Sequence, residues 1–200
     1  HQLTYDFFRN TMLKKGKFAD KERFEAALRN SMYSTNFLIT RYLLVKLDET
    51  HHTREYAPDL WARNEKGKYV WTVEHVLPQT EKITDDWAQM IADGDKYQAS
   101  KIHEQHVHRL GNLTLSGYNS KLATANFHSK QQLSENRKFL GHNINIGYQN
   151  GLAINQLPFS LDGQQISLAD AQKWTAEMID SRTNLMVDIL MDMYTFEGIE

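Results

Sequence analysis

The chain has 200 residues, of which 40% are hydrophobic, and carries a formal net charge of −2 with no cysteine. This length allows a substantial core in one domain, with or without a helical annex. The absence of cysteine excludes disulfides, iron–sulfur clusters and thiolate zinc sites, and it is typical of a reducing cytoplasm. No apolar run approaches the roughly 20 residues that span a bilayer, so we expect no membrane association. Because the first residue is His1, we expect a piece of a longer protein.

The first 66 residues are predicted to be helical. A helix over 20–33 has one apolar stripe at helical spacing. A second helix, over 35–49, is apolar on nearly all sides, which is typical of a helix buried between others. We therefore assign 1–66 to a helical N-terminal subdomain.

Residues 67–140 alternate between strand and helix signals. We predict a strand at 69–76, a helix at 84–94, a strand at 113–115, a turn at 116–117 and a helix that begins at Asn119 or Ser120. The remainder, 141–200, is predicted to be a loop followed by a long helix capped by Ser167. The chain is thus expected to be an α+β protein, mainly α, in which helices surround a small strand–turn–helix core.

Charge is distributed unevenly along the sequence. Residues 101–138 carry six Lys or Arg against two Glu, a local balance of +4. A basic segment within an acidic protein is typical of a phosphate-facing surface, although a solvated helix face gives the same pattern. The candidate phosphate contacts in this segment are Arg109, Lys121, Lys130 and His108.

The stretch WTVEHVLP, residues 71–78, carries two adjacent ionisable side chains near the end of the predicted strand. Phosphodiester hydrolysis needs a base for water, and an imidazole with a pKa near ~6.5 suits neutral pH. It also needs a divalent cation, and Mg²⁺ is satisfied by few protein oxygens because it keeps several waters. His75 is the candidate base, and Glu74 and Asn119 are the candidate metal ligands.

Neighbouring residues of an ideal strand point to opposite faces, which argues against a shared site for Glu74 and His75. Pro78, however, requires the strand to end just after the pair. We expect the twisted end of the strand to let both side chains border one site.

Four motifs in this order, EHVLPQ, HRLGNLTL, NSKL and NFHSK, resemble a known family. It is the HNH-type (His-Me finger, ββα-metal) nuclease domain at the C-terminus of GmrSD-type modification-dependent restriction enzymes. The resemblance is strongest over 70–132. It implies that the small core is a ββα-metal unit within residues 67–140, and that 141–200 packs on the helical part.

The resemblance also implies a role for each motif residue. His75 becomes the general base, and Glu74, where many HNH domains have Asp, becomes a metal ligand. Asn112 ties the loop between the strands, Asn119 contacts the metal, and Lys130 holds a phosphate. Each residue taken alone has an ordinary structural explanation, such as an edge-strand Glu or a helix-capping Asn.

The function implied is metal-dependent cleavage of DNA, with Mg²⁺ or Mn²⁺, in a cytoplasmic restriction system against phage DNA, with modified DNA as one candidate substrate. The partners implied are an N-terminal nucleotide-hydrolysing domain of the same protein and a second copy in a homodimer. Two alternatives stay open: a catalytically silent DNA-binding or protein-interaction module with a degenerate HNH core, and an RNA nuclease. A zinc site at His103, His106 and His108 is a weaker rival, since no fourth ligand is evident.

Overall fold

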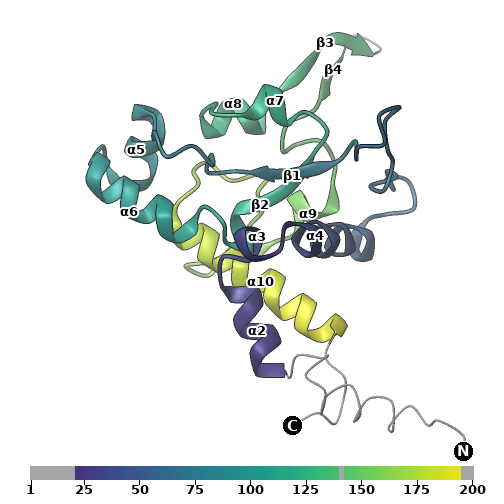
Figure 1. The fold of residues 1–200 in the computed structure, drawn as a ribbon. Helices are drawn as coiled ribbons and strands as arrows, with labels where there is room; N and C mark the ends of the chain where they lie inside the picture. Colours follow the sequence, from purple (N-terminus) through teal and green to yellow (C-terminus); the bar gives the residue numbers. More distant parts are fainter. Residues whose placement is uncertain (1–20, 140–141, 195–200) are drawn as a thin grey trace, which may run out of the picture.

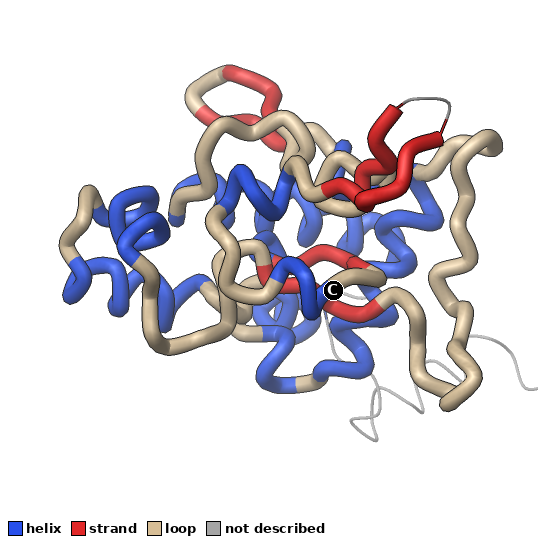
Figure 2. Tube along the Cα trace, turned by 90° about the horizontal axis from the view of Figure 1, so that it is seen from above, coloured by secondary structure: helices blue, strands red, loops and turns tan. Residues whose placement is uncertain are grey.

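The computed structural model describes residues 21–139 and 142–194, so the part of the predicted helical segment in 1–20 lies outside it. The fold is α+β. The described residues form helices and three separate two-stranded antiparallel sheets, as the ribbon in Figure 1 and the strands drawn red in Figure 2 show. Among the described helices, none combines the length and the apolar composition needed to cross a membrane.

Between residues 21 and 51 the structure has three helices where two were predicted: α2 (Lys21–Arg29), α3 (Met32–Thr35) and α4 (Phe37–His51). The side chain of Asn36 caps α4, because its Oδ1 accepts a hydrogen bond from the Ile39 amide at 3.1 Å. The helix predicted over 20–33 is interrupted between Arg29 and Met32, and the N-cap of α4 is Asn36 rather than Ser34 or Thr35.

One face of α4 is buried, but its first turn is not. Leu44 and Leu47 are completely shielded from solvent, whereas Leu38 is 68% exposed. The prediction of a helix buried on all sides is thus wrong for the first turn.

The middle of the chain forms the predicted strand–helix–strand–helix sequence. Strand β1 (Thr72–His75) pairs antiparallel with β2 (Leu113–Ser116), and His75 lies opposite Leu113 in the register. The elements between and after them are α5 (Asp85–Ala92), α6 (Lys96–His106), the 3₁₀ turn η1 (Leu110–Asn112), α7 (Asn119–Leu122) and α8 (Phe127–Gln131). Because α7 follows β2 after a two-residue turn, its first residue is returned to the side of β1.

The C-terminal part is more ordered than the sequence indicated. Where a loop was predicted, the structure has β4 (His142–Asn145), α9 (Ala153–Gln156), β5 (Phe159–Leu161) and β6 (Gln164–Ile166), with β3 (Ser134–Phe139) pairing with β4. The long helix α10 (Ala176–Tyr194) starts nine residues after Ser167. Ser167 instead caps a turn, since its Oγ accepts from the Asp170 amide at 3.2 Å.

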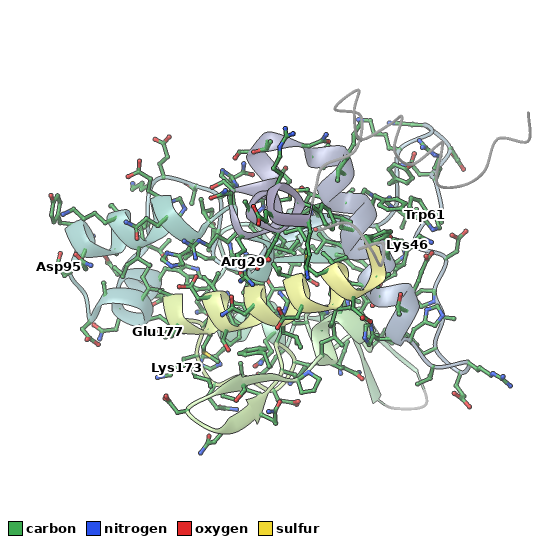
Figure 3. The ribbon with its side chains drawn as sticks, turned by 90° about the horizontal axis from the view of Figure 1, so that it is seen from below. Arg29, Lys46, Trp61, Asp95, Lys173 and Glu177 are labelled. Atoms are coloured by element: carbon green, nitrogen blue, oxygen red, sulfur yellow. The ribbon has the colours of Figure 1, made fainter. Side chains whose placement is uncertain are left out.

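Two apolar clusters form the core, and both join distant parts of the sequence. One packs α4 and the second half of α10 around the β1–β2 pair. The other gathers Trp87, Phe127 and Trp174 beneath the end of β1. Figure 3 shows α10 crossing this side of the molecule, with Arg29 of α2 beside it, where Arg29 donates to Asn184 at 2.6 Å.

The connection before β2 is held tightly against α10. Gly111 has no side chain, and a Cβ there would collide with the Ile179 carbonyl oxygen and with Thr183. The buried Arg182 donates to the carbonyl oxygens of Gly111 and Leu113 at 2.7 and 2.9 Å. These contacts fix β2, and with it β1, relative to the long helix.

Candidate active site at the end of β1

A cavity of about 330 Å³ lies at the end of β1, and we call it the His75 cavity. Three predicted site residues line it together: Glu74, His75 and Asn119. Its walls come from α3, β1, the loop after β1, and α7 with the segment that follows; the other lining residues are Tyr33, Val73, Pro78, Gln79, Thr80, Ala123 and Thr124. Residues from three separate parts of the sequence thus converge on one space.

His75 is the last residue of β1 and is only 6% exposed. Its Nε2 lies 3.2 Å from Nδ1 of His108, and its ring forms a T-shaped contact with the ring of Tyr33. Burial, together with the charges of His108, Lys130 and His103, lowers the pKa of His75 from 6.5 to about 3. The imidazole is therefore neutral at physiological pH, which is the form in which it accepts a proton.

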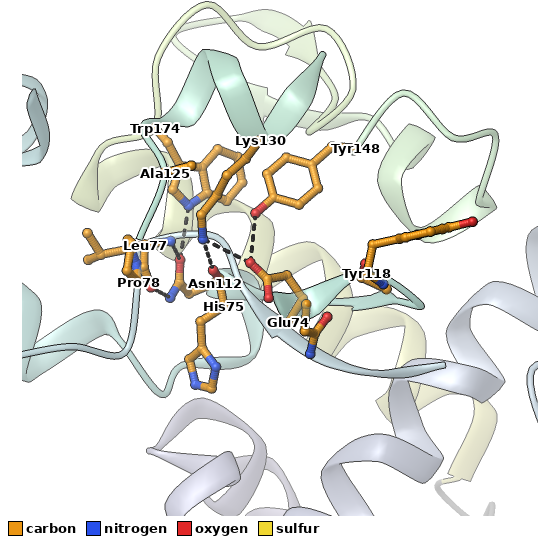
Figure 4. A network of polar contacts seen from close by, with 12 residues as sticks. Glu74, His75, Leu77, Pro78, Asn112, Tyr118, Ala125, Lys130, Tyr148 and Trp174 are labelled. Carbon is orange, nitrogen blue, oxygen red and sulfur yellow. Dashed lines mark hydrogen bonds and ion pairs between the residues drawn. The ribbon is translucent and has the colours of Figure 1, made fainter. Parts of the chain in front are cut away.

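Glu74 points toward Lys130 and Tyr148, whereas the ring of His75 points away from them (Figure 4). Oε1 of Glu74 accepts from Lys130 Nζ at 2.8 Å and from the Tyr148 hydroxyl at 3.4 Å. Burial raises the pKa of the Glu74 carboxyl and lowers the pKa of the Lys130 ammonium, and at both groups it outweighs the attraction within the pair. Among the described residues no hydrogen bond reaches Oε2, the other oxygen of Glu74.

Asn119 opens α7 and holds it against β1. Its Nδ2 donates to the Val73 carbonyl oxygen at 2.7 Å. Its Oδ1 is buried and has no hydrogen-bond partner in the described part of the chain. A buried amide oxygen without a partner carries a desolvation cost, and a ligand that binds the oxygen relieves that cost.

These two oxygens are the groups that a hard cation would use. Carboxylate and amide oxygens suit Mg²⁺ and Mn²⁺, so Glu74 Oε2 and Asn119 Oδ1 fit the expected metal. The described residues contain no group of three His, Asp or Glu side chains that could hold a metal ion. A cation at this place would therefore depend on few protein ligands and on water.

Asn112 is completely buried and lies beneath the His75 cavity rather than on its wall. Its Oδ1 accepts from the Leu77 amide at 2.8 Å and from the Trp174 indole at 3.1 Å. Its Nδ2 donates to the carbonyl oxygens of Leu77 and Val107 at 3.0 and 2.9 Å. All of its polar capacity is used to hold the segment after β1, which agrees with the loop-tying duty and not with contact to a reacting group (Figure 4).

A comparison of the sequence with models of known protein families identifies the family of the chain. Residues 18–189 match the model of the family described as GmrSD restriction endonucleases, C-terminal domain. The chain belongs to this family. Membership implies restriction endonuclease function, with DNA as the substrate. Searches of curated proteins and of solved structures gave no match.

The candidate phosphate contacts of this GmrSD C-terminal domain have three different environments. Lys130 is 0% exposed and donates to Glu74 and to the His75 carbonyl oxygen, which contradicts its expected contact with a phosphate. Arg109 is partly exposed and pairs with Asp180 at 2.5 Å. Lys121 is exposed on α7, the helix whose first residue lines the His75 cavity, and remains a candidate.

The three histidines of the rival zinc cluster make separate contacts. His103 contacts the Pro78 carbonyl oxygen through Nε2 at 2.8 Å, and His106 contacts the Ile102 carbonyl oxygen through Nδ1 at 2.8 Å. His108 turns toward His75. Their free ring nitrogens do not meet at one metal-binding group within the described residues.

Two aromatic residues of the site were not anticipated from the sequence. Tyr33, on α3, contacts the rings of both His75 and His108. Tyr148, in a stretch predicted to be loop, is buried and reaches Glu74. Neither residue lies in a recognisable motif, so no local signal in the sequence marks it.

Proposed function

We propose that this GmrSD C-terminal domain is a metal-dependent DNA endonuclease of the HNH type, with β1, β2 and α7 as its ββα-metal core. The observation that carries the proposal is the His75 cavity, which brings a neutral imidazole, a carboxylate and an unpartnered buried amide oxygen together. Family membership supports the substrate, and the cavity supports the chemistry.

His75 acts as the general base. Its neutral ring accepts a proton from the water that attacks the phosphorus atom in line. A pKa of about 3 describes a weak base, and it arises from burial and from neighbouring cationic groups. The phosphate of bound DNA brings negative charge to the site, which favours the protonated ring and raises the basicity during the reaction.

Glu74 and Asn119 would hold a divalent cation, with Oε2 and Oδ1 as the available oxygens. The cation would supply positive charge against the phosphate and the departing 3′ oxygen. Lys130 and Tyr148 keep Glu74 in place by holding its other oxygen. Lys121, exposed on α7, is the candidate contact for the DNA backbone, and the expected products are 5′-phosphate and 3′-hydroxyl ends.

The wider setting follows from the family resemblance alone. We propose a role in a cytoplasmic defence against phage DNA, within a longer protein whose N-terminal domain hydrolyses a nucleotide and licenses cleavage. A homodimer would allow one active site to act on each strand.

One observation favours an alternative function. The carboxylate of Glu74 is already paired with a buried cation, Lys130, as in a protein that has exchanged its metal for a fixed charge. Such a chain would be a DNA-binding or protein-interaction module with a silent HNH core.

The deciding experiment is nicking of supercoiled plasmid with Mg²⁺, with Mn²⁺ and with EDTA. We expect metal-dependent nicking by the wild type, its loss in His75→Ala, and its retention in His128→Ala, which removes an exposed histidine from α8. Matched RNA tests the RNA-nuclease alternative. Folded protein that shifts DNA on a gel but never cuts it would support the silent module instead.

A further inference from the structure

His75, the last residue of β1, shares a hydrogen bond with His108, which follows α6. His75 Nε2 and His108 Nδ1 are 3.2 Å apart, and the rings are inclined by 77°. Two neutral imidazoles can form this bond only if one of the two nitrogens carries the hydrogen and the other accepts it. If His75 donates from Nε2, its Nδ1 is left with a free lone pair, which is the form a base requires.

Tyr33 clamps this pair from the side of α3. Its ring is stacked on His108, with centroids 5.4 Å apart and an angle of 17°, and it forms a T-shaped pair with His75, with centroids 4.5 Å apart. Rotation of either imidazole would break one of these ring contacts. The orientation of His75 is thus restrained by one hydrogen bond and one aromatic neighbour.

Asn112 ties the two segments that carry the histidines. It bonds to Leu77, two residues after His75, and to Val107, the residue before His108. The main-chain carbonyl oxygen of Asn112 also accepts a hydrogen bond from the Val76 amide at 2.9 Å. One buried side chain therefore sets the separation of the two rings.

We propose that His108 is a positioning residue for His75: its Nδ1 accepts the hydrogen on His75 Nε2, and this directs the unprotonated Nδ1 of His75 toward the water to be activated. The inference rests on the proposed function, because it assigns His108 to the same reaction. It replaces the expected role of His108 as a phosphate contact. Orienting partners of this kind change activity by roughly 10–100-fold where they have been removed from metal sites.

Two substitutions of His108 separate the hydrogen bond from the packing. His108→Asn can place an amide oxygen near the position of Nδ1 while losing the ring that stacks on Tyr33. His108→Phe keeps an aromatic ring for Tyr33 but has no acceptor. His108 is partly exposed and borders a second cavity of about 590 Å³, so neither substitution leaves a large new cavity in the core.

In the nicking assay we expect His108→Phe to lower kcat by roughly 10–100-fold with little change in KM. His108→Asn should restore most of the activity, to within about fivefold of the wild type. Equal losses in both variants would assign His108 to packing alone. Full activity in both would remove it from the reaction.

A second measurement does not depend on cleavage. Nitrogen chemical shifts of labelled histidine report which ring nitrogen carries the hydrogen, and we expect His75 to be protonated at Nε2 in the wild type and in His108→Asn, and to lose this preference in His108→Phe. A His75 protonated at Nδ1, or one indifferent to His108→Phe, overturns the inference. Failure of the wild type to nick DNA with any metal would overturn the proposed function, and the chemical shifts would still decide the role of His108.

Discussion

Lys130 and Glu74 form an ion pair that is almost completely shielded from solvent. Nζ lies 2.8 Å from Oε1, and the two side chains are 0% and 7% exposed. Lys130 also donates to the His75 carbonyl oxygen at 2.8 Å, so that one ammonium from α8 holds two consecutive residues of β1. The end of β1 is thereby fixed from within the protein rather than by contacts on its surface.

Removal of Lys130 should therefore destabilise the fold as well as the site. In Lys130→Met the carboxylate of Glu74 stays buried without its partner, and we expect the free energy of unfolding to fall by about 3–5 kcal/mol in urea denaturation. The double variant Lys130→Met/Glu74→Gln should be more stable than the sum of the single changes, because it leaves no buried charge. A loss below about 1 kcal/mol in the single variant would mean that the pair is hydrated in solution.

Asn119 should control metal affinity. In Asn119→Ala the unpartnered Oδ1 is gone, and we expect binding of Mn²⁺, measured by calorimetry or by electron paramagnetic resonance, to weaken about tenfold or more, or ~1.4 kcal/mol. The control is Ser120→Ala, one residue along the same helix and exposed. Unchanged Mn²⁺ affinity in Asn119→Ala would remove Asn119 from the ligand set.

Gly111 should tolerate no side chain. A Cβ at this position collides with backbone and side-chain atoms of α10, and we expect Gly111→Ala to cost about 1–3 kcal/mol of stability, the usual range for overpacking. Gly117→Ala is the matched control, since the nearest atoms to its Cβ would be 3.7 and 3.8 Å away. Equal thermal midpoints for the two variants would show that η1 can move away from α10.

The buried His75 should make stability depend on pH. Its pKa is about 3 in the folded protein and near 6.5 in the unfolded chain, so between these values only the unfolded chain binds the proton. Proton binding by the unfolded chain therefore does not lower the free energy of unfolding above pH 6.5. As the pH falls from 6.5 toward 3, the free energy of unfolding decreases by up to about 1.4 kcal/mol per pH unit. His75→Phe keeps a ring without a titrating nitrogen, and its urea midpoint should fall less between pH 6.5 and 4. Parallel profiles for the two proteins would contradict the burial of a neutral imidazole.

Elements with local stop and start signals were predicted well. The helix expected over 84–94 is α5, with Thr84 Oγ1 accepting from the Trp87 amide and with Asp93 and Gly94 at positive φ where it ends. The strands at 69–76 and 113–115 are confirmed with small changes in their ends. Caps and turns depend on a few residues that are adjacent in the sequence, so they can be predicted from the sequence alone.

Errors occurred where tertiary contacts decide the structure. Ala171 and Trp174 follow a helical spacing but are buried in an irregular segment before α10, because Trp174 packs on Phe127 and bonds to Asn112. The hairpin β5–β6 did have a local signal, the Asp162–Gly163 turn with φ of 49° and 77°, which the loop assignment overlooked.

The proximity of three candidate site residues could also be predicted from local sequence signals. Glu74, His75 and Asn119 were named from short motifs, and they do line one cavity. The partner of Lys130 could not be found in this way, since charge on a sequence does not reveal which ammonium is buried. The contacts of Tyr33 and Tyr148 depend on packing between distant segments.

The candidate site depends on aromatic residues that lie outside the middle segment of the chain. Tyr33, Tyr148 and Trp174 all lie outside residues 67–140, yet they contact His75, Glu74 and Asn112 respectively. A graft of 67–140 onto another scaffold would carry the candidate catalytic side chains but not the three aromatic residues that contact them. Transfer of the proposed activity to another protein, by recombination or by engineering, would therefore need the flanking segments that contain Tyr33, Tyr148 and Trp174.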